Sequence, residues 1–338
     1  MKERIVLAYA GDLETSVAIP WLAEAYGAEV VTLTLDLGQG RDLEEIRDRA
    51  LATGAVRAHV LDVREEFAHD FVLPALQAGA LHEGRDPMAA ALGRPLIARK
   101  LIEIASIEEA IAIAHGCTGV DQERMDASTR ALNPDVRVIA AARAAVPSQS
   151  THANLWGRVV TLTKSQAQSL KSKIPNPKSP VPTGAPGTSA SVEIAFERGV
   201  PVAINGVPMA LTELIESLSI IAGQHGVGRI AVEEIDVAGA HLRHVHEAPA
   251  AVVLHAGLTA LEMSLLPREV MRLKRERATE YAHLVCGGLW FTAAREAMDA
   301  LNATVQETVT GSVRITLSKG TLITSEAVAL DHVAVPRT

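Results

Sequence analysis

The stretch LAYAGDLETS, from Leu7 to Ser16, decides the fold of the N-terminal half. It includes the end of an apolar run, Ile5 to Tyr9, that is typical of a buried strand, and it precedes Val17 to Leu22, which has the composition of a helix start. A glycine-bearing turn between a strand and a helix is an anion site, because free amides and the positive end of the helix dipole face the same point. The stretch therefore predicts a phosphate-binding loop.

Strand-like and helix-like segments alternate through the first 143 residues, which indicates a parallel sheet covered on both faces. The strands are predicted at residues 4–10, 29–36, 57–63, 109–115 and 135–142. The helices are predicted near residues 15–27, 41–52, 64–79, 94–107 and 121–131. Ligands of such sheets bind at the carboxyl ends of the strands. We therefore expect the turn Ala10 to Asp12 and the segment His115 to Thr118 to face one cleft.

Composition excludes several classes of function. A net charge of −8 argues against a nucleic-acid-binding surface, and no apolar run approaches the length of a membrane span. Two cysteines, Cys117 and Cys286, make no disulfide framework and fit a reducing cytoplasm. Met1 to Arg4 leads straight into a strand, so we expect no signal peptide and a cytoplasmic protein.

The chain changes character after the alternating part. Residues 171–187, KSKIPNPKSPVPTGAPG, are rich in Pro, Gly and Lys, which is typical of a mobile loop or linker. Strand and helix patterns resume from residue 191. We therefore predict an α/β domain over residues 1–143, an irregular linker over 144–190 and an α+β domain over 191–338.

Long blocks of the sequence resemble argininosuccinate synthases, which are N-type ATP pyrophosphatases. They include AEVVTLTLDLGQG (28–40), FVLPALQAGALHEGR (71–85), AHGCTG (114–119) and FERGVPVAING (196–206), in family order. The resemblance implies a nucleotide-binding domain like those of adenine nucleotide alpha hydrolases, followed by a synthetase-like domain. It also implies a ligase that activates citrulline with ATP and then joins it to aspartate.

The resemblance assigns the nucleotide loop but also shows departures. The family sequence AYSGGLDTS stands here as AYAGDLETS, so that Ala10, Asp12 and Glu14 replace Ser, Gly and Asp. The positions expected to contact the cofactor are Ala8, Gly11, Thr15, Ser16 and Gly116. A carboxylate at Asp12 would repel pyrophosphate by roughly 1–4 kcal/mol per charge at about 4 Å, unless Mg2+ inverts the sign. One interpretation is therefore that the loop is now only a strand–helix connection.

The substrate positions are matched in part. The matches are Thr118 for aspartate and Asp121, Arg124, Ser150 and Glu234 for the remaining amino-acid contacts. Family tyrosines and serines are replaced at Asp86, Ala91, Val159 and His246. The candidate catalytic residues are Asp121, Arg124 and His246, although Asp121 fits a helix N-cap equally well.

Three histidines, His241, His244 and His246, lie within six positions in a predicted strand. His244 and His246 share one face of it and would need a carboxylate to hold a divalent metal, so we assign no metal site. His246 is alternatively a general acid or base in a remodelled pocket.

Two interpretations follow. In the first, the chain keeps the fold but has lost ordinary ATP-dependent ligation, uses no cofactor, and binds or converts an amino-acid-like ligand, or is non-catalytic. In the second, it is a working synthase that uses ATP and Mg2+. The first is favoured by the number of altered ligand positions. The resemblance implies a C-terminal arm that family members use in tetramer assembly, and this arm is shortened in the present sequence. We therefore expect a homo-oligomer, and a dimer rather than a tetramer.

Overall fold

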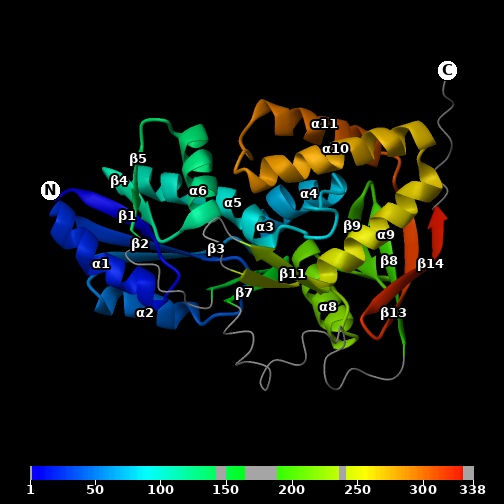
Figure 1. Cartoon of the computed structure of the whole chain (residues 1–338), viewed down its shortest axis with the longest axis horizontal. Helices are drawn as coiled ribbons and strands as arrows, with labels where there is room; N and C mark the ends of the chain where they lie inside the picture. The colour runs from blue at the N-terminus through cyan, green and yellow to red at the C-terminus, as the bar shows by residue number, and fades with distance from the viewer. Residues whose placement is uncertain (1, 142–149, 164–188, 236–240, 330–338) are drawn as a thin grey trace. The chain divides into compact units, whose positions relative to one another are not determined.

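The computed structural model describes residues 2–141, 150–163, 189–235 and 241–329 (Figure 1). The chain forms two compact units, each built from several segments. The first contains residues Met1–Phe67, Ala90–Ser148 and His283–Glu296, and the second contains Ala68–Ala89, Gln149–Ala282 and Ala297–Thr338. The predicted linker 171–187 lies outside the described residues, so the predicted domain boundaries at 143 and 191 stay predictions.

The first unit is an α/β fold around a parallel sheet, as predicted. The strands are β1 (Arg4–Ala8), β2 (Glu29–Asp36), β3 (Arg57–Asp62), β4 (Ala112–His115) and β5 (Arg137–Ala140). The helices are α1 (Leu13–Tyr26), α2 (Leu43–Ala52), α3 (Arg64–Phe67), α5 (Ala89–Ile107) and α6 (Gly119–Leu132). The strand order is β3-β2-β1-β4-β5, and all four pairings are parallel.

This order places the connections after β1 and β4 side by side. From β1 the chain moves outward to β2 and β3, whereas from β4 it moves outward in the other direction to β5. A ligand crevice forms where the winding reverses in this way, outside the carboxyl ends of the two central strands.

The core of this sheet is aliphatic, as the 3% aromatic content requires. Ile5, Leu7, Ile19 and Leu22 are completely buried, and alanines fill much of the remaining space. Small side chains let α1 lie close to the strands.

One predicted helix is not continuous in the structure. Residues 64–79 form α3, a π-helical turn over Ala68–Val72, and α4 (Leu73–Gln77) rather than one helix. Pro74 lies at the start of α4, where its missing N–H costs least and where an interrupted helix can restart. The division between the two units falls at Phe67, where the π-helical turn begins.

The second unit contains two antiparallel sheets. One has the order β10-β9-β8-β13-β14, and the other has the order β11-β12-β7-β6. The first sheet comprises β8 (Ala190–Glu197), β9 (Val200–Ile204), β10 (Val207–Pro208), β13 (Gly311–Ser318) and β14 (Thr321–Ala329). The second comprises β6 (Ser150–Asn154), β7 (Gly157–Thr163), β11 (Arg229–Ile235) and β12 (His241–Glu247). Its helices include α4, α8 (Leu211–Gln224), α9 (Pro249–Leu265) and most of α10 (Arg268–Cys286) and α11 (Ala293–Gln306). No described helix is both long and apolar enough to cross a membrane.

A charged cluster lies inside the second unit. The Nζ atom of Lys274, on α10, is 2.7 Å from Oε1 of Glu262, on α9, and the two side chains are only 5% and 2% exposed. Gln306 donates to the same carboxylate oxygen at 2.6 Å. One ion pair and one hydrogen bond therefore connect α9, α10 and α11 in the interior of the unit.

His255, on α9, should make the protein less stable as the pH is lowered. Burial, with help from the charge of Lys274, lowers the pKa of His255 from 6.5 to about 3. Between these values the unfolded chain binds more protons than the folded one, so stability is lost as pH falls through this window. From pH 7 to pH 5 we expect a loss of about 2 kcal/mol, from a slope of roughly 1.4 kcal/mol per pH unit.

Urea unfolding at the two pH values measures this effect. Between pH 7 and pH 5, the variant His255→Leu should lose much less unfolding free energy than the wild type, because the group responsible for most of the loss is gone. Equal losses in the two proteins would contradict the assignment to His255.

Candidate functional site

The turn after β1 is shaped by Gly11. Its φ of +75° is a conformation that side chains rarely adopt. A Cβ atom there would lie 2.8 Å from Cγ1 of Ile46, on α2, so the turn also has no room for one. Glycine is therefore required at this point for two reasons, and Ile46 supports the turn from behind.

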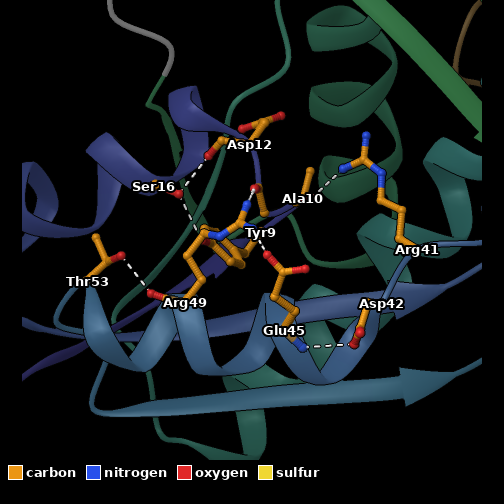
Figure 2. Close-up of polar contacts among 10 residues, drawn as sticks. Tyr9, Ala10, Asp12, Ser16, Arg41, Asp42, Glu45, Arg49 and Thr53 are labelled. Carbon is orange, nitrogen blue, oxygen red and sulfur yellow. Dashed lines mark hydrogen bonds and ion pairs between the residues drawn. The ribbon is translucent and has the colours of Figure 1, made fainter.

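Asp12 is the N-cap of α1. Its Oδ1 accepts a hydrogen bond from the backbone N–H of Thr15 at 2.8 Å and from the Thr15 hydroxyl at 2.6 Å. The Ser16 hydroxyl donates to the Asp12 carbonyl at 2.7 Å and lies 2.8 Å from the hydroxyl of Tyr9 (Figure 2). Asp is among the best residues for this position, so the replacement that looked harmful in the sequence has a folding role.

Backbone donors remain available along the turn. Within the described part of the chain, the N–H groups of Ala10, Gly11, Asp12 and Leu13 donate no hydrogen bond to protein. The first N–H groups of a helix have no partner within it, and the helix dipole adds positive charge at the same place. The turn can therefore bind an anion through its backbone.

Gly116 joins this turn from the neighbouring strand. A Cβ on Gly116, which follows β4, would lie 3.2 Å from Cγ2 of Thr15. The segments that follow β1 and β4 therefore lie next to each other, while the expectation that they face one cleft stays a prediction. Of the five residues expected to contact the cofactor, Ala8 ends β1, Gly11 lies in the turn, Thr15 and Ser16 lie in the first turn of α1, and Gly116 follows β4.

Asp121 lies between two arginines in the first turn of α6. Its Oδ2 accepts from Arg94 at 2.7 Å, and its Oδ1 accepts from Arg124 at 2.8 Å. The N-cap of α6 is the exposed Thr118, which makes no side-chain capping bond, so the N-cap interpretation of Asp121 is wrong. Arg94 lies on α5, and its contact with Asp121 could not be predicted from the spacing in the sequence.

Arg124 is held from the C-terminal part of the chain. Its Nε donates to the carbonyl of Cys286 at 2.8 Å, within the first unit.

Cys117 lies near Arg94. Burial raises the pKa of the Cys117 thiol, and this effect outweighs the charge of Arg94, which lowers it. Cys117 is therefore poorly suited to act as a thiolate nucleophile.

His246 is paired with Asp86 in the second unit. Its Nδ1 lies 3.1 Å from Oδ1 of Asp86, and the two side chains are 12% and 21% exposed. Burial raises the pKa of Asp86, but the hydrogen bond and charge of His246 outweigh it and bring the pKa below its ordinary value. Both residues occupy positions where the resemblance places a tyrosine, and the two substitutions contact each other.

The other expected residues of this unit are placed by backbone only. Ser150 begins β6, Glu234 lies on β11, and His241 and His244 lie on β12 of the same sheet. Their side chains lie outside the described part of the structure, so the suggested grouping of the three histidines stays a prediction.

Replacing Gly11 by alanine should destabilise the first unit more than the same change at Gly27. Both glycines have a positive φ, but a Cβ at Gly27 meets nothing within 4 Å, whereas at Gly11 it meets Ile46 at 2.8 Å. Backbone strain of about 1–2 kcal/mol applies to both variants. We expect Gly11→Ala to lose at least about 1 kcal/mol more, since overpacking costs roughly that much. Denaturant unfolding of the two variants measures the difference, and equal losses would contradict the proposed contact.

Comparison with known proteins covers nearly the whole chain. Residues 4–157 match the family described as Arginosuccinate synthase N-terminal HUP domain, and residues 150–328 match the Arginosuccinate synthase C-terminal domain. The argininosuccinate synthase of Symbiobacterium thermophilum is 44% identical, over 94% of this chain and 86% of the relative. That of Carboxydothermus hydrogenoformans is 40% identical, over 95% and 87%. That of Rubrobacter xylanophilus is 42% identical, over 94% and 84%.

These matches overturn the favoured interpretation of the sequence. The expectation of a degraded or repurposed protein that needs no ATP is wrong, because relatives with 40–44% identity along almost their full length are argininosuccinate synthases. The structure supplies a physical reason for the error. The Asp12 carboxylate binds the first turn of α1, so it cannot be counted simply as a charge facing the nucleotide.

Proposed function

Because the chain belongs to the argininosuccinate synthase family, we propose that it joins citrulline to aspartate in an ATP-dependent reaction that releases AMP and pyrophosphate. The observation that carries the proposal is the match to both family domains along residues 4–328. The turn between β1 and α1 agrees with it, because its free N–H groups suit a phosphate.

The residues can be given roles within this proposal. The turn formed by Ala8, Gly11, Thr15 and Ser16, with Gly116 beside it, would hold the phosphates of ATP, which is accompanied by Mg2+. Phosphate groups bind here through backbone N–H groups, and Gly11 leaves the space that a side chain would fill.

The amino-acid substrates are assigned to two sets of residues. Thr118, Asp121 and Arg124 of the first unit supply a hydroxyl, a carboxylate and a guanidinium. Ser150, Glu234 and His246 belong to the second unit. Substrates with both charges need such mixed partners, and we propose the residues of each set as substrate ligands, with Asp121, Arg124 and His246 as the candidate catalytic residues.

Pyrophosphate release tests the proposed function. The purified protein with citrulline, aspartate and Mg-ATP should release pyrophosphate and form argininosuccinate in equal amounts. Reactions lacking citrulline provide the control, because activation needs its ureido oxygen. Absence of product above that control, with a folded protein, would overturn the proposal.

We also propose a cytoplasmic homo-oligomer, a dimer rather than a tetramer. The two thiols are free, as a reducing compartment requires. Ile220 on α8 and Met263 on α9 are 63% and 62% exposed, so both offer apolar surface to a partner copy. Light scattering at micromolar concentration measures the assembly, and a monomer or tetramer mass would contradict this proposal.

A further inference from the structure

Two arginines bind the outer side of the anion-binding turn. Nη1 of Arg49, on α2, donates to the carbonyl of Gly11 at 2.5 Å, and Nη1 of Arg41, just before α2, donates to the carbonyl of Ala10 at 2.7 Å. Figure 2 shows both side chains reaching the turn. Neither residue was singled out by the sequence patterns.

These bonds determine where the neighbouring N–H groups point. No peptide bond of the described chain is cis, and in a planar trans peptide the C=O and N–H groups point in opposite directions. The carbonyl of Ala10 shares its peptide with the N–H of Gly11, and the carbonyl of Gly11 shares its peptide with the N–H of Asp12. Holding both carbonyls toward the arginines therefore turns both N–H groups away from them. These are two of the N–H groups that have no protein acceptor.

The helix that carries Arg49 is itself fixed. Asp42 caps α2 by accepting from the N–H of Glu45 at 3.0 Å, and the Glu45 carboxylate pairs with Nη2 of Arg49. One guanidinium thus binds Glu45 through one nitrogen and Gly11 through another. Ile46, one turn earlier on the same helix face, packs behind Gly11.

We propose that Arg49, assisted by Arg41, is a positioning residue that holds the turn with its N–H groups directed at the phosphates of ATP. The proposal rests on the proposed function for its ligand. The two guanidinium groups also bring positive charge to a turn that carries Asp12 and Glu14, which favours a polyanion there.

Titration calorimetry with Mg-ATP tests the proposal. We expect Arg49→Ala to raise the dissociation constant at least about tenfold, since a charge-assisted hydrogen bond contributes about that much. Arg41→Ala should raise it roughly threefold, and the double variant more than either. Arg47→Ala is the matched control, because Arg47 is exposed on the same helix and is not a hydrogen-bond partner of the turn. It should remain within about twofold of the wild type.

Arg49→Lys separates geometry from charge. Lysine keeps the charge but cannot bind Glu45 and Gly11 through a planar fork, so it should restore affinity only in part. Wild-type affinity in Arg49→Ala, or equal losses in Arg49→Ala and Arg47→Ala, would overturn the proposal.

A second measurement separates this inference from the proposed function. The N–H groups of Thr15 and Ser16 bond to Asp12, so their hydrogen exchange reports whether the turn is held without any ligand. If the wild type does not bind Mg-ATP, the proposed function fails. In that event, faster exchange in Arg49→Ala than in Arg47→Ala supports the positioning role, and equal exchange overturns it.

Discussion

Replacing Lys274 by methionine should lower the free energy of unfolding by about 3–5 kcal/mol, the cost of leaving a buried charge without its partner. The carboxylate of Glu262 is 2% exposed and would keep only its hydrogen bond from Gln306. Methionine fills a similar volume, so the loss would come from charge and not from a cavity. Urea unfolding at pH 7 measures it.

Two further variants make the result specific. Arg272→Met removes the pair with Glu276 on the same helix, where the side chains are 73% and 48% exposed, and it should cost less than about 1 kcal/mol. Adding Glu262→Gln to Lys274→Met should restore much of the stability, because the uncompensated charge is then gone. A cost below about 1 kcal/mol for Lys274→Met alone would show that water reaches the cluster.

Asp121→Asn should reduce kcat/KM for argininosuccinate formation by at least about a hundredfold, if the proposed function holds. The carboxylate orients both Arg94 and Arg124, and an amide can neither neutralise nor hold two guanidinium groups. Losing one well-placed electrostatic group in an active site typically costs about 100–1,000-fold. Steady-state pyrophosphate release at saturating Mg-ATP measures the loss.

The control for this variant lies on the same helix. Glu123→Gln removes one negative charge from an exposed position of α6 and should leave kcat/KM within about threefold of the wild type. Circular dichroism of both variants shows whether they are folded. Near-normal activity in a folded Asp121→Asn protein would contradict the role of Asp121.

The sheet of the first unit could be predicted because its central strands are largely apolar and alternate with helix-like segments. β2, for example, was expected at residues 29–36 and is observed at Glu29–Asp36. The position of Gly116 beside the turn at Gly11 followed from topology, since parallel strands bring their carboxyl ends to one edge.

Contacts between distant charged side chains could not be predicted in this way. The pairs Arg94–Asp121 and Asp86–His246 join segments that are far apart in the sequence, and no periodicity connects them. Asp12 was misinterpreted for a different reason. Its role as a helix cap was available from the sequence, but comparison with the family loop directed attention to its charge.

The segment His283–Glu296 has a consequence for the order in which the chain is made. It belongs to the first unit, where the carbonyls of Cys286 and Gly288 accept from Arg124 and Ser128, and Gly288 packs against the backbone of Arg124. Ser128 and Gly288 are 160 residues apart, so at about 5–20 residues per second a ribosome adds the second partner roughly 8–30 s after the first. During that interval the emerging N-terminal sheet holds α6 without this support. A nascent chain arrested before Cys286 should therefore be cut by proteases within α6, and one arrested well beyond Glu296 should be protected there.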